Sequence, residues 1–431
     1  MTLVHIVSTL VFIVTFAVIL SERIHRTIVA VVGATLMVIV GMLFGFYSQK
    51  QALEAIDFNT LGLLMGMMIL VSMLEKTGFF QYLAIFVARW SRGRPWYLMI
   101  LLGTVTAVLS MFLDNVTTVV LIVPVTLLIA QLLGINPLPL LMAETLLSNV
   151  GGTATLVGDP PNVLIGSAAG FSFNDFLIHL GPVVPLAWLA TLLLLRVIFR
   201  QELAQVPEDV TAVMRLNPAD ALHDQATLRK ILIALGITIL LFFLHGLLHL
   251  TAAFVAMIGA ASALAWVRPD VDQILKDVEW GVLLFFAALF VAVGGLEAAG
   301  VLYALGQVLA SLAGGNLVVT SLLLLWGAAF LSAIVDNIPF TIAIIPVIQY
   351  LDSVGVPTTA LWWALALGAG FGGNGTPIGS TAGVLTMRLS EKTHTPITFK
   401  TWQRSGLVVT VVTCLVASVF FVLFFGWMST R

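Results

Sequence analysis

Near-continuous apolar runs follow one another along most of this 431-residue chain. Many reach the roughly 20 residues that a helix needs to cross the hydrocarbon core of a bilayer. Because lipid offers no hydrogen-bond partner to an exposed backbone, such runs must fold as helices. Only 9% of the residues are charged, against roughly 25% in soluble domains. The sequence therefore predicts an all-α polytopic membrane protein and excludes both a soluble enzyme and a disordered chain.

Charge and motif content exclude further classes. The net charge is −2, without the clustered basic patch of a nucleic-acid binder. Cys414 is the single cysteine, which excludes a disulfide framework and a multi-cysteine metal site. The sequence has no H-E-x-x-H, G-x-S-x-G or G-x-x-x-x-G-K-[ST] motif, so we expect neither an enzyme nor an ATP-driven pump, and no cofactor or metal. His245 and His249 are interpreted as interfacial histidines, because two ligands do not make a metal site.

The two halves of the chain resemble each other. A shift of 222 positions aligns several motifs, and a one-residue gap extends the match to the glycine-rich segments. We interpret this as a duplication, with a first repeat at 1–199, a linker at 200–229 and a second repeat at 230–431. The aligned pairs are Glu75 with Glu297, Gly78 with Gly300, Asp114-Asn115 with Asp336-Asn337, Pro124 with Pro346, and 151–155 with 372–376.

The charges indicate that the repeats are inverted. Segment 76–94 carries four Lys and Arg residues, whereas its counterpart 298–316 carries no charged residue. Since positively charged loops stay in the cytoplasm, these segments are expected on opposite sides of the membrane. An inner-membrane topology with both termini outside and a cytoplasmic linker places every Lys and Arg except Lys50 and Arg431 on the cytoplasmic side.

Each repeat is predicted to contain about five spanning helices and one re-entrant hairpin. The hairpins lie at about 97–133 and 317–351, with Asp114-Asn115 and Asp336-Asn337 at their tips. An ionised side chain at mid-membrane costs roughly 2.5–3.5 kcal/mol on insertion scales, so both aspartates are predicted to bind solute or couple its transport. The alternative is that both pairs are polar loop ends at the membrane surface.

Two glycine-rich segments, 148–162 and 370–381, are predicted to break a span. A break frees N–H donors for a polar solute and carbonyls for a cation; the alternative is close helix packing by small residues. Asp159 is interpreted as either a proton or ion carrier or a half-helix cap, and Glu144 as either a packing or a coupling carboxyl. The predicted site comprises Asp114, Asn115, Thr117, Thr118, Asn149, Gly151, Gly152, Thr153, Thr155, Asp159, Asn162, Asp336, Asn337, Gly373, Asn374, Gly375 and Thr376.

These motifs resemble the ion transporter superfamily, in its branch of arsenite permeases, sodium/proton antiporters and the pink-eyed-dilution (P) protein. The similar segments occur in family order across both halves. They are LDNVTTVVLIVPV (113–125), NVGGTATLVGDPPNVLIGS (149–167), VEWGVLLFFAALF (278–290), VDNIPFTIAIIPV (335–347) and FGGNGTPIGSTAGV (371–384).

The resemblance implies scaffold and transport domains that work by an elevator motion, usually in a homodimer, with solute held between the hairpin tips and the glycine-rich breaks. It also implies a cytoplasmic ATPase partner in some arsenite systems. Since two tip carboxylates disfavour a dicarboxylate, we expect proton-motive-force-driven efflux of arsenite or antimonite, with the proton or sodium as coupling ion. Sodium/proton antiport and a P-type anion permease or channel are the alternatives.

Overall fold

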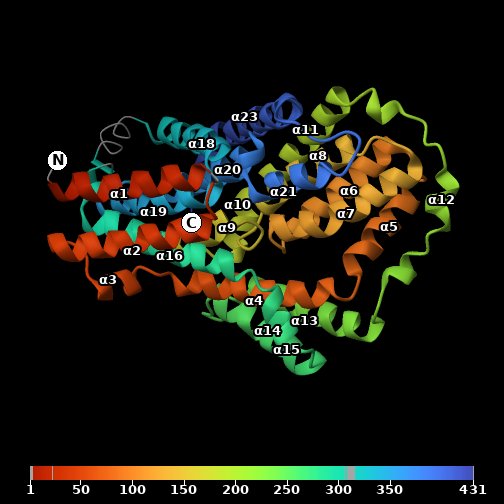
Figure 1. The fold of residues 1–431 in the computed structure, drawn as a ribbon. Coiled ribbons are helices and arrows are strands. Elements are labelled where there is room, and N and C mark those ends of the chain that lie inside the picture. Colours follow the sequence, from red (N-terminus) through yellow and green to blue (C-terminus); the bar gives the residue numbers. More distant parts are fainter. Residues whose placement is uncertain (1–2, 22, 305, 308–315, 431) are drawn as a thin grey trace.

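The computed structural model describes residues 3–21, 23–304, 306–307 and 316–430, and these contain helices and no strand (Figure 1). The first half contains α1 (Leu3–Leu20), α2 (Arg26–Phe44), α3 (Gln49–Glu54), α4 (Phe58–Glu75), α5 (Phe79–Trp90), α6 (Pro95–Ser110), α7 (Asn115–Leu133), α8 (Leu138–Gly152), α9 (Pro160–Ala169), α10 (Phe173–Leu180) and α11 (Val183–Ile198).

The middle of the chain contains η1 (Glu202–Ala204), α12 (Val210–Arg215) and η2 (Pro218–Ala221). The second half contains α13 (Gln225–Leu244), α14 (Ala252–Val267), α15 (Val271–Asp277), α16 (Trp280–Ala298), α18 (Leu317–Ile334), α19 (Asn337–Ser353), α20 (Thr359–Gly372), η3 (Pro377–Gly379), α21 (Thr381–Ser390), α22 (Phe399–Trp402), η4 (Gln403–Leu407), α23 (Val408–Leu423) and α24 (Phe425–Met428).

Seven of the described helices are long and apolar enough to cross a membrane, and the number is eight if the bent pair α9 and α10 forms one span. The axes of that pair meet at 114°, as a broken span or a re-entrant segment would. The count agrees with a polytopic membrane protein, while five spans in each half remain a prediction. The seven helices are α2, α4, α7, α13, α16, α18 and the helical stretch Phe399–Leu423.

The described helices pack into two groups. In the first, α2 packs on α16 and α4 packs on α14. In the second, α6 packs on α8, α18 on α20, and α7 on α21. Figure 1 shows α4, α13, α14 and α15 along one edge of the molecule, with α18, α20 and α23 toward the opposite edge. We call these the α2–α4–α14–α16 group and the hairpin group.

Similar helix lengths recur in the two halves at the offset seen in the sequence. The pair α6 and α7 has its counterpart in α18 and α19, and α8 has its counterpart in α20. In both α6–α7 and α18–α19, a short turn that ends at the Asp-Asn motif joins the two helices. The inverted orientation of the halves and the elevator division stay predictions.

The predicted linker 200–229 contains the short helices η1, α12 and η2, but its last five residues already belong to α13. Asp224 caps that helix by accepting hydrogen bonds from the backbone N–H groups of Ala226 (2.9 Å) and Thr227 (3.0 Å). A capping aspartate is a standard helix start, which explains why α13 begins within the polar stretch. Most of the short apolar run at 300–313 lies outside the described residues.

Candidate functional site

The two hairpin tips are formed by the caps of α7 and α19. Asp114 precedes α7 and accepts hydrogen bonds from the Thr117 backbone N–H (2.8 Å) and hydroxyl (2.5 Å). Thr118 also donates its hydroxyl to the Asp114 carbonyl at 2.9 Å. Asp336 precedes α19 and accepts a long hydrogen bond from the Ile338 N–H (3.4 Å). The sequence thus uses each aspartate to start the second helix of a pair, which fixes its carboxyl at the tip.

Threonines in the two breaks tie each break to a hairpin tip. The Thr155 hydroxyl donates to the carbonyl of Met111, at the end of α6. The Thr376 hydroxyl donates to the carbonyl of Ala333, near the end of α18, at 2.5 Å. Both threonines therefore satisfy a carbonyl at a helix end that has no partner within its own helix. Their hydroxyls therefore hold each break against the adjacent helix end.

Glycines in the breaks allow helices to approach closely. A Cβ on Gly152 would lie 2.6 Å from the Gly158 carbonyl oxygen, and one on Gly375 would lie 2.6 Å from the Ala333 Cβ. A Cβ on Gly373 has its closest neighbour at 3.3 Å, the Gly379 carbonyl oxygen. Gly152 and Gly375 therefore fit the close-packing alternative, whereas Gly373 is only tightly surrounded.

Buried asparagines join the first hairpin tip to both breaks. Asn115 donates to the Asn149 side-chain oxygen at 2.7 Å, and Asn149 in turn donates to the Asn374 side-chain oxygen at 2.8 Å. Asn149 also donates to the Ser380 hydroxyl at 3.0 Å. Asn374 completes the chain by donating to the Leu146 carbonyl at 3.1 Å. Such a buried polar network is strong only when its members find partners, so it holds the two breaks in one register.

Asn162 occupies carbonyls that the first break exposes. Its side-chain amide lies within hydrogen-bonding distance of the carbonyls of Gly152 (3.3 Å), Thr153 (3.1 Å) and Thr155 (2.8 Å). The Thr153 hydroxyl bonds back to the Asn149 carbonyl at 2.8 Å. In this conformation the carbonyls predicted to be free for a cation are therefore held by an amide.

Asp159 faces the second hairpin tip. The Asn337 amide lies 3.3 Å and 3.4 Å from the two carboxylate oxygens of Asp159, and both residues are buried. Asp159 directly precedes α9, but its side chain makes no cap hydrogen bond there. The capping interpretation of Asp159 is therefore wrong, and its carboxyl remains as a carrier candidate between the two halves.

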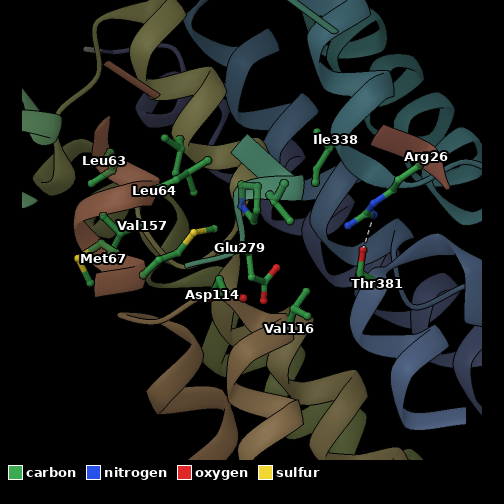
Figure 2. Close-up of a pocket in the computed structure, with 14 residues that line it drawn as sticks. Arg26, Leu63, Leu64, Met67, Asp114, Val116, Val157, Glu279, Ile338 and Thr381 are labelled. Atoms are coloured by element: carbon green, nitrogen blue, oxygen red, sulfur yellow. Dashed lines mark hydrogen bonds between the residues drawn. The ribbon is translucent and has the colours of Figure 1, made fainter. Parts of the chain in front are cut away.

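A small central pocket lies where these elements meet, with a volume of about 40 Å³ (Figure 2). Of the predicted site residues, all of which are described, Asp114 is the one in its wall. The Glu279 carboxyl points toward Asp114, while Arg26 and Thr381 lie together on another side. The wall consists of Arg26, Leu63, Leu64, Met67, Met68, Asp114, Val116, Val157, Pro160, Val163, Glu279, Val282, Ile338 and Thr381.

Arg26 connects the first residue of α2 to the second hairpin tip. Its Nη1 lies 2.8 Å from Asp336 Oδ2 and 2.9 Å from the Thr381 hydroxyl, which itself donates to Asp336 at 3.2 Å. The guanidinium also lies 5.2 Å from the centre of the Phe285 ring. The side chains of the ion pair are 29% and 17% exposed, so water screens this contact less than an open surface pair.

Glu279 lies one residue before α16 and completes the acidic part of the pocket. Burial raises the pKa of its carboxyl to about 7; the negative charge of Asp114 acts in the same direction, and Arg26 opposes both. A carboxyl with such a pKa exchanges its proton near neutral pH.

Arg26, Glu279 and Thr381 line the pocket but are not among the site residues predicted from the sequence. In the sequence-based predictions, Arg26 is one of the cytoplasmic positive charges, and Glu279 is part of a segment that resembles the family. Both stand directly at the start of an apolar helix, and this position at a span end is the signal that identifies them. Thr381 is the first residue of α21 and the last residue of the predicted break 370–381, but its contact with the distant Arg26 is not visible in the sequence.

Two other candidates, His245 and Glu144, lie outside the wall of the central pocket. The Phe173 N–H donates to His245 Nε2 at 2.9 Å, and the other ring nitrogen contacts the Leu250 carbonyl at 3.0 Å. No group of three or more possible metal ligands occurs among the described residues. Glu144 is buried, and its Oε1 accepts a hydrogen bond from the Thr126 hydroxyl at 2.5 Å, whereas its Oε2 has no hydrogen-bond partner among the described residues. The packing and coupling interpretations of Glu144 therefore both stand.

Comparison with known proteins places this geometry in a family. Residues 16–368 match the citrate transporter family. The chain is 42% identical over 422 residues to a 46 kDa membrane protein of Mycobacterium leprae, covering 96% of this chain and 97% of that protein. It is 34% identical over 482 residues to the human P protein, covering 93% of this chain but 58% of that longer protein.

A solved structure shares the fold. The YdaH transporter of Alcanivorax borkumensis superposes with a TM-score of 0.63 at 18% sequence identity, covering 95% of this chain and all of that chain. The resemblance to the ion transporter superfamily is thereby confirmed, with the P protein among the relatives. The chain belongs to the citrate transporter family and is a membrane transporter.

Proposed function

We propose that the chain is a proton-motive-force-driven secondary transporter that exports a small solute, with arsenite or antimonite as the first candidate. The observation that carries this proposal is the pairing of Asp114 and Glu279 in a central pocket of about 40 Å³. Because one water needs roughly 10–15 Å³ of such space, the pocket has room for about three water-sized groups, which suits a small inorganic solute or an ion. Arsenite near neutral pH is largely a small uncharged trihydroxide, which carboxylates can bind through its hydroxyl groups.

Under this proposal the carboxylates alternate between a protonated state and a solute-bound state. Asp114 lines the pocket, whereas Asp336 contacts two residues that line it, Arg26 and Thr381. Asp159, buried between the halves, is a third group that can hold a proton. Protonation neutralises the charge that otherwise opposes movement through the bilayer. An elevator motion of the hairpin group against the α2–α4–α14–α16 group then carries the site across.

The test uses inside-out membrane vesicles with an imposed pH gradient. Addition of arsenite should dissipate the gradient and load the vesicles with arsenic, and Asp114→Asn should abolish both. Asn keeps an oxygen that can cap Thr117, so the fold should survive. The matched control is Glu54→Gln, which removes an exposed carboxylate from a surface pair with Lys50 and should change nothing. Arsenite uptake that is unaffected by Asp114→Asn and Asp336→Asn would refute this mechanism.

The same vesicles separate the coupling ions. Under sodium/proton antiport, sodium alone would dissipate the gradient without arsenite, and Asp114→Asn would abolish that response. The excess of acidic over basic side chains in the pocket wall, two against one, favours a cation over an anion at this position. Replacement of sodium by choline distinguishes the two outcomes, because choline is too large for the pocket.

Anion transport is the second candidate function. It is favoured by the Arg26 guanidinium at the border of the pocket and by the family description as a citrate transporter. Currents under voltage clamp that follow an anion gradient, without proton or sodium coupling, would select a passive permease. Counterflow of labelled citrate would select coupled transport.

We also propose the inner-membrane topology, with both termini outside and 200–229 in the cytoplasm, because it places nearly all Lys and Arg residues on one side. A homodimer and a cytoplasmic ATPase partner are proposals that rest on the family resemblance. Labelling of a cysteine at Val206, which is 86% exposed within the linker, tests the orientation. An impermeant thiol reagent should reach it in inside-out vesicles and fail to reach it in intact cells.

A further inference from the structure

A second, larger cavity lies beside the central pocket. It measures about 460 Å³ and carries three basic side chains, Arg26, Arg388 and His25, against one acidic side chain, Asp336. We call it the basic vestibule. Its remaining lining is Ile19, Ile24, Val335, Pro339, Ile378, Thr381 and Val384.

The contact between Arg26, Asp336 and Thr381 forms the wall between the two cavities. Arg26 and Thr381 line both of them, and Asp336 lines the vestibule. The three side chains are mutually hydrogen bonded at 2.8, 2.9 and 3.2 Å. A solute can pass from the vestibule into the pocket by this route only if that contact opens.

The chemistry of Arg26 suits an exchange of partners. A guanidinium carries five N–H donors in a planar fork that matches a carboxylate or an oxyanion. Both of the contacts above use the same nitrogen, Nη1. Because Asp336 reaches Arg26 with one oxygen, an incoming anion that binds in a bidentate manner offers the stronger partner.

The hairpin tips differ in this respect although their motifs are copies. At the offset of 222 the counterpart of Arg26 is Leu248, so the repeat supplies no second guanidinium. Asp114 instead faces Glu279 across the pocket. Among the described residues, the Arg26 contact therefore occurs at the second tip and not at the first. An anion in the vestibule meets more basic than acidic side chains on the far side of this contact from the central pocket.

We propose that the basic vestibule is a docking site for a carboxylate or an oxyanion, and that the docked anion takes the place of Asp336 on Arg26 and opens the wall to the central pocket. This inference rests on the proposed route through that pocket. It assigns Arg26 as the gating residue, Arg388 as an attracting charge, and Thr381 as the hydroxyl that moves with Asp336.

The test measures access to the pocket directly. Val163 lines the central pocket but not the vestibule and is only 2% exposed, so Val163→Cys in a Cys414→Ala background reports opening through its rate of reaction with N-ethylmaleimide. The purified full-length protein in detergent is used, and mass spectrometry follows the labelling. The probes are citrate and sulfate, each compared with chloride at equal ionic strength.

We expect slow labelling without the probes and about a tenfold acceleration with citrate or sulfate, which corresponds to ~1.4 kcal/mol. Arg26→Gln should label fast without any probe and show no response to them. Arg388→Gln should label slowly at first and need more citrate for the same acceleration. A second reporter at the exposed Val206, in the linker, should react equally in all variants, and Arg26→Lys provides a milder variant if Arg26→Gln misfolds.

The proposal is overturned if neither citrate nor sulfate changes the labelling rate. It is also overturned if the rate in Arg26→Gln is no higher than in the parent. An equal response to chloride also overturns it, because that result means charge screening without a docking site. The reporter needs no transport, so the proposed efflux function is judged separately. Vesicles without arsenite flux would refute the efflux proposal even if citrate still accelerates the labelling. Arsenite flux together with labelling that does not respond to anions would refute the docking proposal alone.

Discussion

Gly151 offers a test of why the first break is rich in glycine. A Cβ built on Gly151 lies 2.7 Å from both the carbonyl carbon and the Cα of Ala107, and closer still to its carbonyl oxygen. These are backbone atoms of α6, so no side-chain rotation can relieve the clash. Ordinary contact begins at about 3.4 Å, and Gly151→Ala must therefore separate α6 from α8 by roughly 0.7 Å or more.

Overpacking of a tightly packed interface costs about 1–3 kcal/mol. We therefore expect Gly151→Ala to lower the melting temperature of the detergent-solubilised protein by at least ~2 °C, at about 2–4 °C per kcal/mol for a domain of moderate size. Transport should fall as well, because the Asn149 network begins two residues away on the same helix. Gly372→Ala should behave alike, since its Cβ would lie 2.6 Å from the Ala329 carbonyl oxygen.

The matched control is Gly327→Ala within α18, where a Cβ meets no atom within 4 Å. It makes the same chemical change in a helix and should leave the melting temperature unchanged or slightly higher, because alanine favours helix over glycine. Differential scanning fluorimetry of the purified variants compares all three. If Gly151→Ala and Gly327→Ala both have the melting temperature of the parent protein, the close-packing explanation is refuted.

Three further predictions concern single contacts. Glu279→Gln should remove an inflection near pH 7 from the pH profile of transport, because the Glu279 pKa is raised to about 7; a profile with the inflection retained would contradict this. Lys76→Met should lower stability by at most ~1 kcal/mol, since both partners of its 2.7 Å pair with Asp277 are more than a third exposed. That loss should be seen above the ordinary Asp277 pKa of 3.8 and vanish as the pH falls below it, because the Lys76 hydrogen bond lowers the pKa of Asp277; thermal melts at several pH values check the sign. Trp402→Phe should cost about 1 kcal/mol through loss of the 2.9 Å hydrogen bond from its indole N–H to the Asn374 carbonyl, and an unchanged melting temperature would refute that role.

Much of the fold follows from apolar run lengths and from the positions of helix-breaking residues. The breaks fall where glycine and proline interrupt the runs, between α8 and α9 and again between α20 and α21. The hairpin tips lie at the Asp-Asn pairs because an aspartate caps each following helix. These features are local in sequence, and a local pattern suffices to predict them.

The pocket wall could not be predicted in the same way. Asparagines and threonines of the breaks were expected to face the solute, but Asn149, Asn374 and Asn162 bond to one another or to the backbone instead. Whether a polar side chain faces a cavity or a neighbouring helix depends on tertiary contacts, and those of Asn374 with Asn149 and Leu146 join residues more than 200 positions apart. Arg26 and Asp336, separated by 310 positions, meet only because α2 packs beside the second hairpin tip.

The two tip aspartates therefore carry the same motif and different electrostatics, and this has a consequence for mechanism. Asp336 already has a cation beside it, since Arg26 lies 2.8 Å from its carboxylate. Asp114 has hydroxyl and amide donors from Thr117 and the acidic Glu279 nearby. We therefore assign proton coupling to the first tip, beside Glu279, and the proposed gate to the second tip, beside Arg26. Asp114→Asn should abolish proton coupling, whereas Asp336→Asn should weaken closure of the wall and leave some coupled flux. Equal loss of coupling in both variants would show that the repeats work symmetrically after all.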